Sequence, residues 1–248
     1  MISFLRKIRK SLIKSGSARR YLLYSIGEIA LVVIGILLAL QVNNWNERRK
    51  NNSRLKAIIP GLLAEIRHDS VEISNTMVTL GAELELLRQF EFRLNQEESS
   101  VDTLIQIAKN EFTPGVNDVA LFMNNVTYTT LIQSGEISLF PNHFVQAINE
   151  YYMLYNQLNR TDQHSWTLYT SAVSQYLDVF TFNGSFISNG PINEAIWENP
   201  DIQVLGPKFG KFANIKRLYM RTLKGHLEPM VEKNEHLITQ LKKIQVGM

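Results

Sequence analysis

The chain has no cysteine among its 248 residues, and the familiar enzyme motifs are missing as well. Without cysteine there are no disulfides, no thiolate zinc sites and no cysteine nucleophiles. The sequence also contains no nucleophile elbow, no phosphate-cradling glycine loop, no HExxH zinc motif and no kinase-type signature. Because catalytic triads assemble from distant residues, an enzyme is not excluded. Nothing points to one, however, and we expect a non-enzyme with no cofactor, no catalytic residue and no metal site.

Acidic residues are missing from positions 1–20, which carry seven Lys/Arg. Apolar residues recur there at helical spacing between the basic ones, so we predict a basic amphipathic segment lying on the anionic inner leaflet. A docking helix for a cytoplasmic partner is the less favoured interpretation. Without this segment the chain has 19 Lys/Arg against 23 Asp/Glu, so nothing in the remainder suggests nucleic acid as a partner.

Residues 21–42, YLLYSIGEIALVVIGILLALQV, form an apolar run that predicts a transmembrane helix. At about 1.5 Å of rise per residue, such a run crosses the roughly 30 Å hydrocarbon core. It is too long and too late for a cleaved secretory signal and lacks a small-x-small cleavage site, so we predict an uncleaved signal anchor. Tyr21, Tyr24 and Trp45 lie where aromatic residues contact the membrane interface.

The charges on the two flanks of this run predict its orientation. Seven basic residues and no acid precede it, whereas five basic residues and Glu47 occupy positions 43–56. By the positive-inside rule the N-terminus is cytoplasmic and the large C-terminal part is exported.

Glu28 interrupts the apolar run about two helical turns from its start. A carboxylate there costs about 2.5–3.5 kcal/mol on insertion scales unless it is paired or protonated. It indicates either a proton- or ion-linked site or a polar contact between two copies of the helix. We favour the second, because Gly27, Leu31, Gly35 and Ala39 recur at every fourth position and small residues permit close approach. The sequence therefore predicts a homo-oligomer associating through Gly27, Glu28, Gly35 and Ala39.

The string IGEIALVVIGILLALQVNNWNE, residues 26–47, follows a basic start that includes FLRKIRK. Both resemble the signature of an uncharacterised bacterial membrane family, domain of unknown function 6090. Residues 130–152, TLIQSGEISLFPNHFVQAINEYY, are similar to a second motif of that family. The resemblance implies a single-pass inner-membrane protein of a Gram-negative bacterium, with the exported part in the periplasm. It brings no known activity and no catalytic residues.

Residues 43–54 are polar and form the expected membrane-exit linker, which is either irregular or a helical continuation of the span. An apolar repeat with alternating steps of three and four follows, with Asp69 and Glu91 in two of its slots. The pattern predicts a long helix with a coiled-coil-like stripe, which Pro60–Gly61 starts or bends. The apolar positions are Leu55, Ile59, Leu62, Ile66, Ile73, Met77, Leu80, Leu84, Leu87 and Leu94.

Several shorter elements are predicted between this helix and residue 180. Ser100 or Asp102 caps a short helix, and Asn117–Asp118 caps another that ends at Gly135. In part of the second helix, apolar and polar residues also alternate as they do in a strand. Pro141–Asn142 starts a longer helix with a broad aromatic face.

Residues 181–210 hold most of the turn residues and are predicted to be a long loop with one short helix around Asn193–Trp197. Such a loop is often a binding surface. A final amphipathic helix from Phe212, kinked at Pro229, packs antiparallel on the first. The predicted fold is all-α: one N-terminal transmembrane helix followed by an elongated helical bundle, residues 55–248, with long amphipathic first and last helices.

Glu65 and His68 have the i, i+3 spacing that di-metal carboxylate bundles use. Such a site needs a second copy of the motif, and Glu232 with Glu235–His236 has the wrong spacing. A solvated helix face is therefore the favoured interpretation of Glu65 and His68.

Three functions from different classes remain. We favour a non-catalytic interaction or scaffold module. Its expected partners are the lipid bilayer and a second copy of the chain, and the sequence leaves open whether a protein of the envelope binds as well. The alternative is a sensor-like ligand-binding bundle working through a separate partner. Its pocket would be lined by Tyr151, Tyr152, Tyr155, Trp166 and Tyr169, although such a stripe is more often core. A membrane-tethered enzyme is the least favoured.

Overall fold

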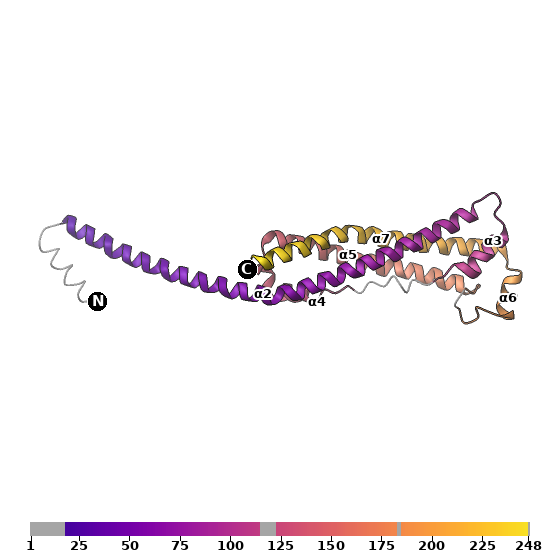
Figure 1. Cartoon of the computed structure of the whole chain (residues 1–248), viewed down its shortest axis with the longest axis horizontal. Coiled ribbons are helices and arrows are strands. Elements are labelled where there is room, and N and C mark those ends of the chain that lie inside the picture. The colour runs from indigo at the N-terminus through magenta and orange to yellow at the C-terminus, as the bar shows by residue number, and fades with distance from the viewer. Residues whose placement is uncertain (1–17, 115–122, 183–184, 248) are drawn as a thin grey trace. The chain divides into compact units, whose positions relative to one another are not determined.

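The structure is a computed structural model that describes residues 18–114, 123–182 and 185–247, with side chains from residue 22 onward. The chain forms two compact units, Met1–Ala57 and Ile58–Met248. Over the described residues it has six α-helices and no strand, as the sequence predicts (Figure 1).

Helix α2 (Ala18–Leu94) begins in the first unit and continues without a break into the second. Residues 43–54, the predicted membrane-exit linker, are therefore a helical continuation of the apolar run. They contain neither glycine nor proline, and the pairs Asn43–Glu47 and Trp45–Arg49 contact one another at helical spacing. Pro60 lies inside α2, so it does not start a new helix.

The second unit is built on three long helices: the part of α2 from Ile58, α5 (Asn142–Leu177) and α7 (Ile202–Val246). Hydrogen bonds join Ile66 to Asn234 and Glu83 to Lys216, so residue numbers rise along α2 while they fall along α7. The first and last helices are thus antiparallel, as predicted. At about 1.5 Å per residue, the 45 residues of α7 extend about 68 Å.

Helix α5 is also antiparallel to α7. Glu150 pairs with Lys233 near one end, and the Gln175 carbonyl accepts from Lys208 near the other. Helices α2 and α5 consequently run in the same direction, and both form hydrogen bonds with α7.

The apolar stripe of α2 faces the interior of the helical bundle. Ten positions were predicted, and seven are buried while Met77, Leu84 and Leu94 are half-buried. The seven buried positions are Leu55, Ile59, Leu62, Ile66, Ile73, Leu80 and Leu87. Of the two polar residues in this stripe, Glu91 is exposed, whereas Asp69 is buried among apolar neighbours of the same stripe.

Short elements connect the long helices. Helix α3 (Val101–Gln106) begins at Ser100, whose hydroxyl accepts from the Thr103 N–H as predicted, and the π-helical turn η1 (Ile107–Glu111) follows it. Helix α4 (Val126–Ser134) ends at Gly135, which has a φ of 73°, and the 3-10 turn η3 (Glu136–Leu139) leads into α5.

The start of α4 differs from the sequence prediction. Asn117–Asp118, the expected cap, lies outside the described residues, and the described helix begins at Val126. Residues 126–132, whose pattern also suited a strand, are helical.

Residues 181–210 are less loop-like than predicted. Helix α6 (Pro191–Glu198) matches the expected short helix, but α7 already begins at Ile202, with Asp201 accepting from the Gln203 N–H. The turn residues Gly206 and Pro207 therefore lie inside α7. The helix extends through them because Leu205, Phe209 and Phe212 recur at helical spacing and are buried. Their burial outweighs the one backbone hydrogen bond that proline removes.

Aromatic rings fill the core at the end of the bundle near α3 and α6. Phe112 lies edge-on to Phe209 and Phe212, with ring centroids 5.0 Å apart in both pairs. Helix α6 is fastened to this end by Trp197, whose indole N–H donates to Thr181 at 2.8 Å.

Candidate functional site

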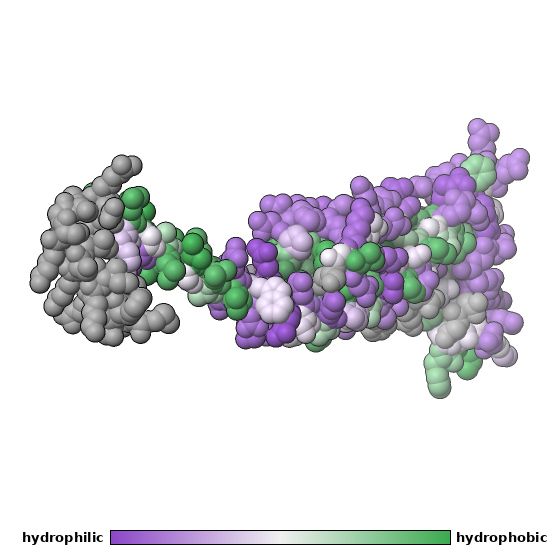
Figure 2. All heavy atoms as spheres, turned by 60° about the vertical axis from the view of Figure 1, so that its left-hand side comes forward, coloured by the Kyte–Doolittle hydropathy of each residue, from purple (hydrophilic) through white to green (hydrophobic). Residues whose placement is uncertain are grey.

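The N-terminal half of α2 presents an apolar surface that the described residues leave uncovered. Residues 22–42 include thirteen large hydrophobic side chains that are exposed in the isolated chain, and Figure 2 shows them as a hydrophobic stretch. Among the described helices α2 is the one long and apolar enough to cross a membrane. Such a surface is stable in hydrocarbon and unstable in water.

The residues predicted to associate helices lie on this surface. Gly27, Glu28, Gly35 and Ala39 are all exposed in the single chain. A Cβ added at Gly27 or Gly35 would meet nothing within 4 Å, so each glycine leaves open space for a neighbouring helix.

Of the predicted membrane-interface residues, Trp45 is exposed and its ring lies 5.3 Å from the Arg49 guanidinium. Tyr24 is half-buried. The side chain of Tyr21 lies outside the described residues.

Two carboxylates are buried one helical turn apart on α2, within the second unit. Glu65 is 6% exposed and Asp69 is 0% exposed. Buried charges need partners, because an unpaired carboxylate in the interior is strongly destabilising. The partners define the most unusual site in the molecule.

Glu65 caps helix α4 from another element. Its carboxylate accepts from the backbone N–H groups of Thr127 at 2.7 Å and Tyr128 at 3.3 Å, the first-turn donors that a helix leaves unpaired. It also accepts from the Tyr152 hydroxyl at 2.6 Å. The positive end of the helix dipole favours a negative charge there.

This geometry corrects the expectation that Glu65 and His68 share a solvated face. His68 is exposed, but Glu65 is not. The first turn of α4 lies over Glu65, and that contact between segments 62 residues apart is invisible in the local pattern. The described residues contain no group of three His, Asp or Glu side chains arranged to hold a metal ion.

Asp69 has fewer partners for its charge. It accepts from the Asn124 N–H at 3.2 Å and from the Tyr151 hydroxyl at 3.0 Å. Burial raises the pKa of Asp69 to about 6; the nearby Glu65 charge also raises it, while the two hydrogen bonds and His68 lower it. Asp69 is therefore a buried proton acceptor that titrates close to neutral pH.

The two tyrosines that donate to these carboxylates also have unusual pKa values. Burial, followed by the neighbouring carboxylates, raises the pKa of Tyr151 and Tyr152 well above the usual tyrosine range. Both hydroxyls thus remain protonated and act as donors to Asp69 and Glu65.

Asn234 brings α7 into the cluster. It is 1% exposed, and its Nδ2 donates to the Ile66 carbonyl at 2.9 Å and to the Tyr151 hydroxyl at 3.2 Å. We call Glu65, Asp69, Tyr151, Tyr152 and Asn234 the polar cluster. Its hydrogen bonds join α2, α4, α5 and α7.

A second buried charge fastens the other end of the bundle. Lys216 is 2% exposed, and its ammonium donates to Glu83 at 2.8 Å and to the Thr113 carbonyl at 2.9 Å. It also lies 5.2 Å from the centre of the Phe112 ring. Lys216 thereby holds the segment after η1 against α2 and α7.

The aromatic residues considered as a pocket lining belong mostly to the core. Tyr151, Tyr152 and Tyr169 are buried, Tyr155 is half-buried and Trp166 is exposed. The Tyr152 ring stacks on Tyr128 with centroids 3.9 Å apart. These rings fill space between helices, so the core interpretation of the stripe is the one the packing supports.

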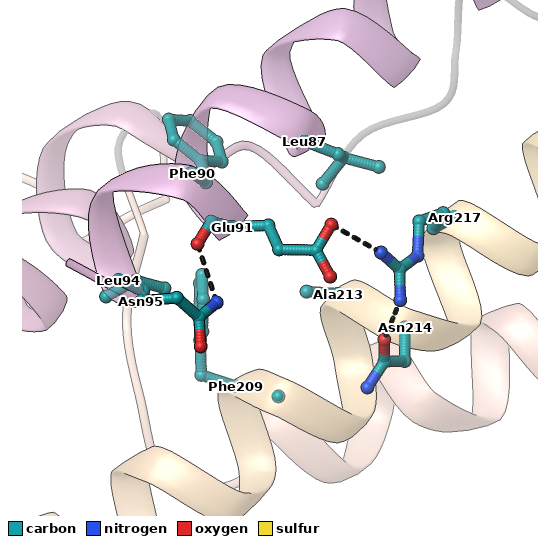
Figure 3. A pocket seen from close by; sticks show the side chains of 10 residues that line it. Leu87, Phe90, Glu91, Leu94, Asn95, Phe209, Ala213, Asn214 and Arg217 are labelled. Carbon is teal, nitrogen blue, oxygen red and sulfur yellow. Dashed lines mark hydrogen bonds and ion pairs between the residues drawn. The ribbon is translucent and has the colours of Figure 1, made fainter.

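A small surface cavity of about 180 Å³ lies between the C-terminal end of α2 and the start of α7 (Figure 3). The Glu91 carboxylate crosses it to meet Arg217 at 2.8 Å, and Arg217 also donates to Asn214 at 2.7 Å. The ion pair occupies the polar side of this cavity and joins the two helices there.

Some of these residues had a sequence signal and others had none. Asp69 occupies a slot of the apolar stripe, which marks it as a candidate buried carboxylate. Lys216 and Asn234 also lie on the buried side of an amphipathic helix, yet no local sequence pattern marks them. Their partners come from α2, from Tyr151 of α5 and from the Thr113 carbonyl, which only the assembled bundle brings close.

Comparison with known proteins gives one match. A model of a family of unknown function, DUF6090, matches residues 28–176. Neither the curated proteins nor the solved structures give a match.

Proposed function

The chain belongs to the DUF6090 family, whose function is unknown, and from that premise we propose a single-pass inner-membrane protein that presents a non-catalytic interaction or scaffold module in the periplasm. The N-terminus is cytoplasmic and the helical bundle is exported. The protein self-associates through its span, and the module binds another protein of the envelope. The observation behind this proposal is the uncovered apolar surface of residues 22–42.

The contacts of the buried polar groups support a structural role for the module. Glu65 caps a helix, Lys216 holds a connecting segment, and Asn234 bonds the α2 backbone. Each has an architectural partner from another part of the chain. A catalytic site needs polar groups that converge on a space where a substrate can lie.

The charge asymmetry around the span supports the orientation. All seven basic residues of positions 1–20 precede the apolar run without an acid among them. Short flanking segments rich in Lys and Arg remain on the cytoplasmic side.

Topology is the test. Alkaline phosphatase, which is active only after export, is fused after Met248, and a fluorescent protein that matures only in the cytoplasm is fused there in a parallel strain. We expect phosphatase activity in membranes and no fluorescence. A control in which Arg6, Lys7, Arg9 and Lys10 are replaced by Gln should weaken this bias. Fluorescence without phosphatase activity in the unaltered chain would overturn the periplasmic assignment.

A further inference from the structure

The segment between α5 and α7 exposes large apolar side chains at one end of the second unit. Helix α6 lies at this end together with α3 (Figure 1), and Figure 2 shows hydrophobic side chains projecting there. The exposed apolar residues of this segment are Val179, Phe186, Ile187, Ile192 and Ile196. Apolar groups are unfavourable in water, and a group of them on a surface marks an interaction site.

Buried polar contacts hold this segment on the bundle. Asn193 is buried, accepts from the Thr181 hydroxyl at 2.8 Å and donates to the Ser188 carbonyl at 2.9 Å. Trp197 is buried as well; its indole N–H donates to the same hydroxyl, and its ring lies 5.7 Å from that of Phe180. The exposed apolar side chains therefore project from a base whose position the chain fixes.

Helix α6 has two exposed sides of different chemistry. At 100° per residue, Ile192 and Ile196 lie about 100° to one side of the buried pair Asn193 and Trp197. Two exposed glutamates, at positions 194 and 198, lie about 100° to the other side. A partner that covers the outer surface of α6 consequently meets isoleucines on one side and carboxylates on the other.

The charges on this segment have a single sign. No Lys or Arg occurs between Arg160 and Lys208, and Lys208 and Lys211 themselves donate to Gln175 of α5. Four exposed acids form no ion pair with any described residue: Asp178, Glu194, Glu198 and Asp201. Their carboxylates attract a basic surface and repel an anionic lipid surface.

We propose that residues 178–182 and 185–201, the α6 surface, dock onto another protein whose binding face has an apolar groove rimmed by Lys or Arg. Phe186 and Ile192 enter the groove, and the basic side chains pair with Glu194 and Glu198. The proposal rests on the proposed function, because it names the surface and the chemistry through which the module binds its protein partner. It does not depend on the side of the membrane on which the bundle lies.

Photocrosslinking in the native host tests this docking with the full-length protein in its membrane. The photoreactive residue p-benzoylphenylalanine takes the place of Phe186, whose side chain is fully exposed. We expect a discrete protein adduct, and mass spectrometry of the crosslinked peptide should show Lys or Arg beside apolar residues. The same probe in place of Val71, exposed on α2 about 35 Å along the helix from Leu94, should not give this adduct.

Variants that retain the probe at position 186 test the two halves of the chemistry. Glu194→Lys combined with Glu198→Lys should lower the adduct yield about tenfold, because two attractive contacts become repulsive. Glu228→Lys combined with Glu235→Lys reverses two exposed charges on α7 and should leave the yield unchanged. Ile192→Ala removes an exposed apolar side chain and should also lower the yield. All yields are divided by the amount of each variant in the membrane fraction.

Several outcomes would overturn the proposal. These are the absence of any adduct, an adduct with a phospholipid or a second copy of the chain, and a crosslinked peptide without basic residues. An adduct whose yield does not respond to the charge reversals on α6 would overturn it as well, whichever protein is captured. Since the probe reacts on either side of the membrane, failure of this test is distinguishable from failure of the topology test.

Discussion

At the scale of single residues, the protein places several charges where solvent cannot stabilise them. Glu65 has three donors around it, whereas Asp69, one turn further on, has two. The same burial therefore leaves the two carboxylates in different situations. Burial raises the pKa of Asp69 to about 6.

The raised pKa of Asp69 makes the stability of the bundle depend on pH. Its ordinary pKa is 3.8 and its folded pKa is about 6, so the folded state holds the proton more tightly than the unfolded chain. The contribution of Asp69 is fully present below pH 4 and is lost as the pH rises through 6. The change amounts to at most about 3 kcal/mol, at 1.36 kcal/mol per pKa unit.

Asp69→Asn keeps an acceptor and cannot ionise. We expect the variant to lose less stability than the unaltered protein between pH 4 and pH 7, by about 2–3 kcal/mol. Urea unfolding of the full chain in detergent, followed by circular dichroism, measures this difference. Glu72→Gln on the same helix is the control and should leave the pH dependence in place. Identical pH dependence in Asp69→Asn and the unaltered protein would contradict the assignment.

At the scale of elements, helix α4 depends on a residue outside it. It has nine residues, which is too short for a stable helix in isolation, and the Asn125 side chain makes no capping hydrogen bond. Glu65 supplies the cap from α2. Formation of α4 is thereby tied to the packing of the long helices.

Glu65→Gln should loosen α4 more than the rest of the bundle. The amide keeps one acceptor oxygen but loses the charge at the helix N-terminus and presents an N–H₂ group to donors. We expect a loss of about 1–3 kcal/mol, since a buried polar group is left unsatisfied. Hydrogen exchange should show faster exchange of the Thr127 and Tyr128 amides.

The matched control is Glu85→Gln. Glu85 is exposed on the same helix, and hydrogen bonds from Arg88 and then Gln89 lower its pKa to about 2. Because solvent replaces those bonds readily, the exchange rates in α4 should not change. Equal effects of the two substitutions on α4 would remove Glu65 from its capping role.

Several helix boundaries follow from local sequence signals. Ser100, Gly135 and Pro141 mark boundaries correctly, because a cap or a left-handed glycine acts within a few residues. Gly206 and Pro207 mislead for the opposite reason. Their local preference is outweighed by the burial of Leu205 and Phe209 against distant partners.

At the scale of the whole molecule, the uncovered apolar surface and its small residues support self-association in the membrane. Gly35 has open space around its Cα, so a larger side chain fits within the single chain. A substitution there tests the proposed contact between two copies of the helix without causing a clash inside the protomer.

Gly35→Leu should therefore reduce the mass of the oligomer that the full-length protein forms in mild detergent. Light scattering after size-exclusion chromatography measures that mass. Ala30→Leu adds similar bulk on another side of the same helix, about 140° away at 100° per residue, and should leave the mass unchanged. A monomer in the unaltered protein, or an unchanged oligomer in Gly35→Leu, would contradict association through this face.

The sequence by itself determined the features that depend on composition and short spacing. The apolar run, the basic start, the stripe of α2 and the all-helical class all follow from residues close together in the chain. Tertiary structure alone decided that Glu65 caps α4, that α7 begins at Ile202, and that Asn234 donates to the backbone of α2. These depend on which surfaces meet across 60 or more residues, and burial at such meetings outweighs local preference.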